Sequence, residues 1–582
     1  MSAYVAASSL MRYVFVALLA YFIAVLIVRS VSEYRCLRAA QRILNLSIHW
    51  IEVLEPVRYR GRWFPLAEDN EIGSGADCEI TLPKSKMKAR HARIVLRKGE
   101  YRFSTKQKRY CEINGQPLIR RETPLRTAMW CGCRTYVLSA IKGVQRRETM
   151  HRLRHARCAA ALSAVLFFTA AAFLLLSFRT ESFDMGALLL GAIVSGVILL
   201  SYCLLSWLAP HADKLLILTV FFLCALGMVV QYRIEPETAA RQLMMLGIGL
   251  AAMLLMMALM RRPRIFRVLS IPMALLSLGI LGALIFVGKE SGGAKNWISV
   301  GGILFQPSEF VKVALVFVLA DALTERTHVR DLVPLFLFVG AVAAFLVLQR
   351  DLGAAMLMAG TFLLVFFVAT SNIRATLAAL LTGSAGAYAS YLMFDHVRAR
   401  IAIWQDPWAT YSTSGYQIAQ GLMAIASGGL WGLGLGQGSP KMIPAYHTDY
   451  IFAVICEEFG IVFGVGVIAL YLLIVVRGVL IALHAEDRFS MLAAFGATAM
   501  LAVQTFVIIG GVIKLIPLTG ITMPFVSYGG SSMIACMLLA GILEGVVAKS
   551  SASLEDALAR DTQPSNDKED GAGYEADEEE RA

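Results

Sequence analysis

Asp449 is the acidic residue of this sequence whose position best suits it to acid–base chemistry. It lies in His447-Thr448-Asp449-Tyr450, at the end of the polar insert 395–449 and just before an apolar segment. Partial burial at the rim of a membrane is expected to raise the pKa of this carboxyl group toward neutrality. A carboxylate with such a pKa can remove a proton from an attacking hydroxyl group. The alternative is structural, because a carboxylate here can also cap the following helix. For His447 we expect an orienting role at most.

Several basic residues lie in polar loops and are candidate contacts for an anionic ligand. Three belong to the insert that contains Asp449 and two to other loops; they are Arg398, Arg400, Lys441, Lys295 and Arg350. Cations in such positions can stabilise the negative charge of an anionic ligand. The alternative for each of them is an ordinary surface charge.

Further charged residues lie inside apolar segments. Glu309 and Lys312 are spaced i, i+3, so they share a helix face and are expected to pair within the membrane. We expect this pair to shape a cavity rather than to transfer a proton. Glu457 lies about two helical turns after Asp449, and nearer its face than Glu458 does. We expect one of these glutamates to line the cavity and the other to join helices.

Long apolar segments must position these residues. The 582 residues are 57% hydrophobic and 16% charged, whereas soluble proteins contain about 25% charged residues. About 13 segments are long enough to cross a bilayer. They are 10–28, 158–178, 186–209, 214–232, 240–260, 265–288, 307–323, 332–348, 352–370, 373–394, 450–476, 491–511 and 524–547. The sequence therefore predicts a polytopic α-helical membrane protein.

The distribution of basic residues predicts the orientation of these spans. Short basic loops normally face the cytoplasm. With the basic loops placed there, the alternation of the spans places the N-terminus and the loops 289–306, 395–449 and 512–523 outside and the C-terminus inside. The net charge of +12 includes the basic segment 142–157, which we expect to contact anionic lipid rather than nucleic acid. The ten cysteines show no zinc-binding spacing, so we expect no metal site.

Residues 45–141 differ from the rest of the chain, because short alternating segments and turns predict a small β-sandwich. The order Ile72-Gly73, His91-Ala92-Arg93-Ile94 and Ile113-Asn114-Gly115 resembles a forkhead-associated (FHA) domain, a reader of phosphothreonine. Ser74 replaces the arginine that binds phosphate in that family, and Lys88 replaces a serine. His91 and Asn114 match positions that maintain the FHA fold. The basic residues around Lys88 could attract a phosphorylated protein or, alternatively, anionic lipid.

Four polar motifs lie at the ends of the last ten apolar segments. They are Gln306-Pro307-Ser308-Glu309, Gln349-Arg350-Asp351-Leu352-Gly353, His447-Thr448-Asp449-Tyr450 and Pro517-Leu518-Thr519-Gly520. In this order they resemble the SEDS (shape, elongation, division and sporulation) family, which includes FtsW, RodA and SpoVE, over residues 214–547. The resemblance implies a ten-helix core that polymerises lipid II outside the membrane, with Asp449 as the motif acid and a class B penicillin-binding protein as partner. Arg350 departs from the family pattern, which has proline at this position.

The reaction implied by this resemblance matches the residues. A sugar hydroxyl group of one lipid-linked disaccharide attacks the anomeric carbon of another and expels a polyprenyl diphosphate. Because diphosphate is a good leaving group, the second carboxylic acid used by glycosidases is unnecessary. One base and several cations suffice, and a divalent cation at the lipid diphosphate is compatible with this chemistry.

The expected organisation has six parts. They are an anchor with a basic stretch (1–44), the FHA-like domain (45–141), a basic linker (142–157), two extra transmembrane helices (158–213), the SEDS-like core (214–549) and an acidic, disordered tail (550–582). Two alternatives to a glycosyltransferase remain, a lipid II flippase and an FHA-anchored membrane scaffold. We further expect the parts before the core to regulate it through a Ser/Thr kinase pathway.

Overall fold

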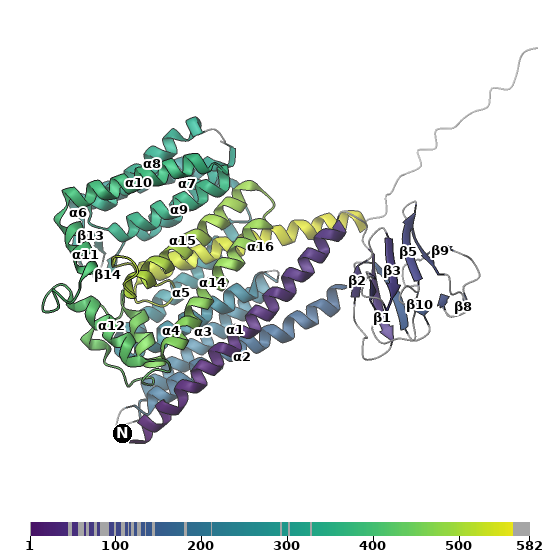
Figure 1. The fold of residues 1–582 in the computed structure, drawn as a ribbon, viewed down its shortest axis with the longest axis horizontal. Helices are drawn as coiled ribbons and strands as arrows, with labels where there is room; N and C mark the ends of the chain where they lie inside the picture. Colours follow the sequence, from purple (N-terminus) through teal and green to yellow (C-terminus); the bar gives the residue numbers. More distant parts are fainter. Residues whose placement is uncertain are drawn as a thin grey trace, which may run out of the picture. The chain divides into compact units, whose positions relative to one another are not determined.

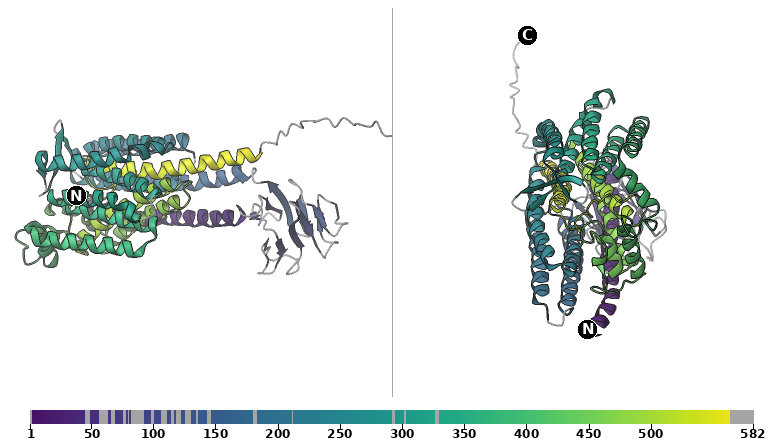
Figure 2. Two further views of the ribbon diagram at one scale, coloured as in Figure 1. Left: turned by 90° about the horizontal axis from the view of Figure 1, so that it is seen from above. Right: turned by 90° about the vertical axis from the view of Figure 1, so that its left-hand side faces the viewer.

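The computed structural model describes residues 2–44, 146–179 and 183–562, with breaks at 211, 292–293, 301–302 and 326–328. Between 49 and 142 it describes the strands and a few residues beside them. The chain forms two compact units, residues 1–20 with 165–582 and residues 21–164. The first is largely helical, and the second contains a group of β-strands (Figures 1 and 2).

The helical unit consists of apolar helices joined by short segments. Its helices are α1 (Ser2–Leu44) and α2 (Arg146–Ser177), both shared with the other unit, and α3 (Met185–Leu208), α4 (Lys214–Ile234), α5 (Pro236–Leu259), α6 (Arg264–Val287), α7 (Ser308–Glu325), α8 (Val333–Leu348), α9 (Leu352–Thr370), α10 (Ile373–Met393), α11 (Asp395–Gln405), α12 (Tyr416–Gly428), α13 (Ile451–Phe459), α14 (Ile461–Leu483), α15 (Arg488–Val512) and α16 (Gly530–Thr562). The connections include the 3-10 turns η3 (Val329–Leu332) and η4 (Pro440–Met442). An antiparallel sheet of β12 (Lys289–Ser291), β13 (Ala294–Val300) and β14 (Ile303–Phe305) joins α6 to α7.

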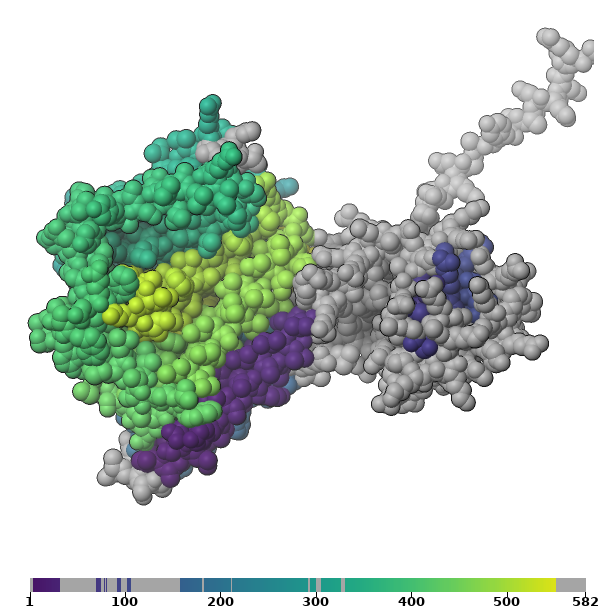
Figure 3. Space-filling view, in the orientation of Figure 1, coloured from purple at the N-terminus to yellow at the C-terminus, as the bar shows by residue number. Residues whose placement is uncertain are grey.

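α4 is buried along nearly its whole length. All its residues from Leu215 to Ile234 are buried, as expected for a helix that is apolar on every face. It packs against α5 and α14, α5 packs in turn against α16, and α15 packs against α7, α9 and α14. The first turns of α1, drawn in purple, lie along the surface of this unit (Figure 3). Phe15 of α1 contacts Phe168 of α2 and Phe459 of α13, with ring centroids 5.5 and 5.7 Å away.

The number of spans agrees closely with the expectation. Eleven described helices are long and apolar enough to cross a membrane, or 12 when α10 and α11, which are bent by 99°, count as one span. The remaining expected span is α7, whose 18 residues include four charged side chains. The expected span 450–476 is divided at Gly460, where φ is 91°. The last expected span begins at Gly530 rather than at 524.

The strands of the second unit form two sheets. One has the order β2-β1-β11-β10-β7-β8 and the other β4-β3-β5-β6-β9. The strands are β1 (His49–Glu55), β2 (Trp63–Pro65), β3 (Asp69–Gly73), β4 (Ile80–Thr81), β5 (Ala92–Arg97), β6 (Glu100–Ser104), β7 (Cys111–Ile113), β8 (Gln116–Pro117), β9 (Glu122–Pro124), β10 (Trp130–Cys133) and β11 (Tyr136–Lys142). Ile72, Ile80, Ile94 and Phe103 are fully buried, so alternating apolar positions form a core, as predicted for a β-sandwich.

The FHA-like positions lie mostly outside the described residues. Ser74 follows β3 directly and is half-buried. Lys88, His91 and Asn114 lie outside the described residues, so their assigned roles stay predictions.

Candidate active site

A tight turn at residues 444–450, called here the Asp449 turn, presents the predicted base. Ala445 has a φ of 53°, and its carbonyl oxygen accepts hydrogen bonds from the backbone N–H groups of Thr448, Asp449 and Tyr450 at 3.2, 3.1 and 3.3 Å. α13 then begins after Tyr450, the N-cap residue, which makes no side-chain capping bond. The Asp449 carboxylate is therefore not the N-cap of this helix, although N-capping was the structural alternative to a role as a base.

The Asp449 turn is attached to two other parts of the helical unit. The carbonyl oxygen of His447 accepts hydrogen bonds from Nε2 of Gln231 on α4, at 3.0 Å, and from the backbone N–H of Tyr528, at 2.9 Å. The Ser527 hydroxyl donates to the Thr448 carbonyl oxygen at 2.6 Å. These bonds fix the backbone on either side of the base without using its carboxylate.

The Asp449 carboxylate is half-buried and faces the segment between α15 and α16. A Cβ atom at Gly520, whose φ is +75°, would lie 3.5 Å from Oδ2 of Asp449. Burial raises the pKa of Asp449 to about 6, while the Thr448 side chain and Arg400 act in the opposite direction. A carboxyl group with this pKa is largely ionised at neutral pH and is still basic enough to accept a proton.

Arg400 is the predicted cation that shares the electrostatic environment of Asp449. It lies on α11, and its Nη1 atom is 3.5 Å from the carbonyl oxygen of Thr519. Its charge interacts favourably with both Asp449 and Asp351. Asp351 caps α9 by accepting the N–H of Ala354 at 3.0 Å. The Arg400 guanidinium group thus interacts electrostatically with both Asp351 and Asp449, which are 98 residues apart in the sequence.

Asp351 belongs to a polar cluster that the sequence analysis did not assign to the site. Its Oδ2 atom accepts hydrogen bonds from Asn296 at 2.5 Å and from Gln306 at 3.3 Å. Asp351 also interacts electrostatically with Glu309 and Lys312. The Asp-Leu-Gly sequence at the start of an apolar helix is the signal that could have identified it, because aspartate at this position is a preferred N-cap residue.

The predicted pairing of Glu309 with Lys312 is confirmed. Nζ of Lys312 lies 2.6 Å from Oε2 of Glu309, and both side chains are buried in α7. Lys312 also donates to Oε1 of Gln504 on α15 at 3.0 Å, and Gln504 donates to the carbonyl oxygen of Thr522 at 2.9 Å. The pair therefore supports the segment that faces Asp449.

The other predicted cations of the insert are exposed. Arg398 pairs with Asp395 one turn earlier on α11, and Lys441 is exposed in η4. No described contact joins either of them to Asp449, so their role at a diphosphate stays a prediction. Among the described residues, no three His, Cys, Asp or Glu side chains are placed to hold a metal ion.

Two predicted cations lie near the small sheet between α6 and α7. Nζ of Lys295 donates to the carbonyl oxygen of Ile285 at 2.8 Å. Arg350 is 55% exposed and lies 3.8 Å from a carboxylate oxygen of Glu290. Its φ of 64° is one that proline cannot adopt, which fits the absence of proline at this position. Ligand contacts by these two cations also stay predictions.

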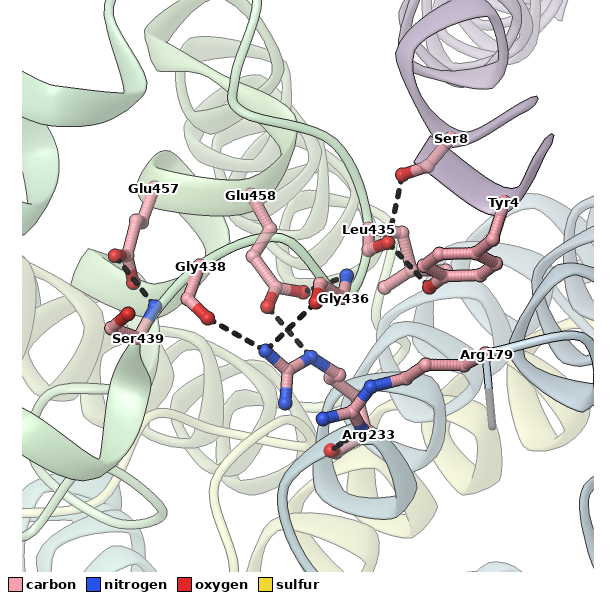
Figure 4. Close-up of polar contacts among 10 residues, drawn as sticks. All are labelled: Tyr4, Ser8, Arg179, Arg233, Leu435, Gly436, Gly438, Ser439, Glu457 and Glu458. Carbon is pink, nitrogen blue, oxygen red and sulfur yellow. Dashed lines mark hydrogen bonds and ion pairs between the residues drawn. The ribbon is translucent and has the colours of Figure 1, made fainter. Parts of the chain in front are cut away.

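The two glutamates of α13 have different partners (Figure 4). Oε1 of Glu457 accepts the backbone N–H of Ser439 at 2.9 Å. Glu458 forms a buried ion pair with Arg233 of α4, at 2.9 Å. Glu458 thus joins two helices, as expected for one of the pair, whereas a role of Glu457 in lining a cavity stays a prediction.

The fold and the site define a multi-pass membrane protein with a half-buried carboxylate at a loop-bounded end of its helices. Residues 206–552 match the model of the FtsW/RodA/SpoVE family, described as "Cell cycle protein". The chain belongs to this family.

Several relatives and structures are similar to parts of the chain. The peptidoglycan glycosyltransferase RodA of Mycobacterium leprae is 35% identical over 364 residues, which cover 58% of this chain and 77% of that protein. A solved structure described as a peptidoglycan synthase complex that coordinates polymerization and crosslinking is 31% identical, covers 59% of this chain and 98% of the matched chain, and gives a TM-score of 0.51. A solved FHA domain is 18% identical, covers 16% of this chain and 96% of that domain, and gives a TM-score of 0.15.

Proposed function

We propose that this chain is a peptidoglycan glycosyltransferase that polymerises lipid II, with Asp449 as the general base. The observation that carries the proposal is the state of this carboxylate. It is half-buried with a pKa raised to about 6, it does not cap a helix, and it shares the field of Arg400. Relatives named peptidoglycan glycosyltransferase support the reaction class.

In the proposed step, Asp449 accepts the proton of a sugar hydroxyl group. The oxygen of that group forms a bond to the anomeric carbon of a second lipid II molecule. The bond between this carbon and the diphosphate oxygen breaks, and undecaprenyl diphosphate leaves with the electron pair. Arg400 offsets the negative charge that develops on the diphosphate, because preorganised cations stabilise such charge most effectively where water is excluded.

The test is polymerisation of labelled lipid II by purified wild-type protein and by Asp449→Asn. We expect the variant to lose a factor of about 10² to 10⁴ in rate, since the amide cannot accept the proton. Asp406→Asn is the matched control, because Asp406 is an exposed acid of the same insert. Polymerisation at the wild-type rate by Asp449→Asn would contradict the role of Asp449 as the base, whereas a wild-type protein that makes no glycan would favour the flippase alternative.

The chain is a multi-pass membrane protein, and we propose that it lies in the bacterial cytoplasmic membrane with the Asp449 turn outside. The FHA-like domain and the C-terminus are then cytoplasmic. The clustering of basic residues in the alternate loops supports this orientation. Protease treatment of intact spheroplasts should spare a tag fused after Ala582, and digestion of that tag would contradict the orientation.

A class B penicillin-binding protein is the proposed protein partner. The support is the similar structure described as a synthase complex for polymerization and crosslinking. Co-purification of such a transpeptidase with this chain, and faster polymerisation in its presence, are the expected results. Unchanged polymerisation with every co-expressed class B transpeptidase would count against this partner.

For the FHA-like domain we propose binding to phosphorylated proteins in a Ser/Thr kinase pathway. Because Ser74 stands in place of the usual phosphate-binding arginine, the basic residue Lys88 is the proposed contact. Capture of a phosphorylated partner should be lost in Lys88→Ala and retained in wild type. Equal capture of phosphorylated and unphosphorylated partners would count against phosphate recognition by this domain.

A further inference from the structure

Residues 429–439, called here the glycine loop, connect α12 to η4 and so lead directly into the Asp449 turn. Two backbone N–H groups of this loop, from Leu433 and Gly434, donate to the carbonyl oxygens of Glu457 and Glu458 at 2.9 Å each. At Gly432, where φ is +82°, a Cβ atom would lie 2.3 Å from the Glu458 carbonyl oxygen. The loop therefore lies in close contact with the end of α13.

The buried ion pair attaches the glycine loop to α4. Arg233, which pairs with Glu458, also donates to the carbonyl oxygens of Gly436 and Gly438 at 3.2 and 2.8 Å. The second carboxylate oxygen of Glu458 accepts the N–H of Gly436 at 3.1 Å. Gln231, two residues before Arg233, contacts the Asp449 turn through the His447 carbonyl oxygen. The end of α4 thus contacts both the loop and the turn.

The first turns of α1 contact the same loop (Figure 4). The hydroxyl groups of Tyr4 and Ser8 both donate to the carbonyl oxygen of Leu435, at 2.7 and 2.8 Å. Arg12 donates to the carbonyl oxygen of Gly432 at 2.8 Å. The three side chains are spaced i, i+4, i+8, so they share one face of the helix.

The approach of α1 to the loop is close enough to require glycine. A Cβ atom at Gly436 would lie 2.2 Å from the Tyr4 hydroxyl oxygen, and one at Gly434 would lie 2.6 Å from the Ser8 hydroxyl oxygen. Beside this contact, the rings of Tyr13 and Trp431 lie 5.5 Å apart. Residues of α1 precede the family match, which begins at residue 206.

We propose that Tyr4, Ser8 and Arg12 form a positioning element, the α1 clamp, which holds the glycine loop and, through it, the Asp449 turn in the geometry for glycosyl transfer. This inference rests on the proposed function. Without the clamp, the Leu435 and Gly432 carbonyl oxygens lose their side-chain donors next to apolar surroundings, where unsatisfied polar groups are costly. The loop then rearranges to satisfy them, and the turn that follows it loses its fixed position. The clamp contributes no group to the reacting atoms, so its effect is on the population of the competent geometry.

The test uses the full chain with both donors to Leu435 removed, in Tyr4→Phe/Ser8→Ala. Two measurements are made on one preparation, the kinetics of lipid II polymerisation and hydrogen–deuterium exchange of peptides that cover 430–450. We expect kcat to fall about tenfold, as for the loss of two hydrogen bonds, with KM changed less than about twofold. Exchange should rise in residues 430–450 and stay unchanged in α5 and α16.

Two variants serve as controls. Ser9→Ala removes a hydroxyl group from the adjacent, half-buried position of α1 and should leave kcat and exchange at wild-type values. Tyr4→Phe/Ser8→Thr restores one donor to Leu435 and should recover part of kcat. Such recovery separates the hydrogen bonds from a general effect on the stability of α1.

The outcomes are distinct. Unchanged exchange in Tyr4→Phe/Ser8→Ala would overturn the clamp. Raised exchange in this double variant would also overturn it if kcat stayed at the value of the Ser9→Ala control. A wild-type protein that makes no glycan would instead contradict the proposed function, and the exchange data would still report separately on whether α1 orders the loop.

Discussion

Asp449 and Glu458 are acids separated by nine positions on one continuous segment, yet their surroundings are opposite. Glu458 is 1% exposed and forms a direct ion pair with Arg233, which is 5% exposed. Asp449 is half-buried and has a cation, Arg400, in its field, but it makes no described ion pair with that cation.

This difference indicates that Glu458 has a structural role, whereas Asp449 can accept a proton. Both oxygens of the buried Glu458 carboxylate already accept hydrogen bonds, one from Arg233 and one from the backbone N–H of Gly436, so this acid is committed to structural contacts. A half-buried carboxylate without such a partner has a raised pKa and can accept one. The same segment therefore supplies an internal support and the proposed base.

The largest expected effect concerns the structural acid. Glu458→Gln leaves the buried Arg233 without its ionic partner, and breaking a buried pair of this kind costs about 3–5 kcal/mol. We expect the midpoint of thermal unfolding in detergent to fall by many degrees, and polymerisation to fall with it. Arg233→Met/Glu458→Leu is the control, because two apolar residues leave no buried charge. If Glu458→Gln unfolded at the wild-type midpoint, the pair would have no supporting role.

The next effect concerns the cation near the base. Arg400→Gln should lower the polymerisation rate about tenfold to a hundredfold, as for the loss of one preorganised charge-stabilising group. Because Arg400 lowers the pKa of Asp449, the variant should also need a higher pH for half-maximal rate. Arg374→Gln, which changes an exposed basic residue of α10 that has no predicted ligand contact, should retain the wild-type rate within about twofold. Equal losses in both variants would show that Arg400 has no special position.

A smaller effect concerns stability at the base itself. The pKa of Asp449 is raised from 3.8 to about 6 in the folded protein, so ionisation opposes folding as pH rises through this range. Asp449→Asn should therefore unfold at an equal or higher temperature than wild type at pH 7.5, and the difference should shrink at pH 5. A marked loss of stability at pH 7.5 would instead assign Asp449 a structural role.

Local patterns in the sequence were sufficient for much of this site. The i, i+3 spacing of Glu309 and Lys312 predicted their pairing. The polar-to-apolar junction at Tyr450 predicted Asp449 as the base, and this role stays a prediction. The alternation of apolar residues in 45–141 predicted the sandwich whose core includes Ile72 and Phe103.

Contacts between distant segments could not be predicted in the same way. Arg233 and Glu458 are 225 residues apart, and neither has a periodic signal that names its partner. The contact of Tyr4 with Leu435 spans 431 residues. The signal in the sequence is the i, i+4, i+8 spacing of Tyr4, Ser8 and Arg12 at the start of α1. This spacing can be interpreted only when the opposing carbonyl groups are known.

The most direct test of Asp449 as the base is the pH dependence of kcat/KM for lipid II polymerisation by wild-type protein, which reports the pKa of essential groups in the free enzyme. The rate should rise with pH through a half-maximal value near pH 6, because the base must be ionised. A rate that is constant between pH 5 and 7.5, or half-maximal near pH 4, would contradict a half-buried Asp449 as the proton acceptor.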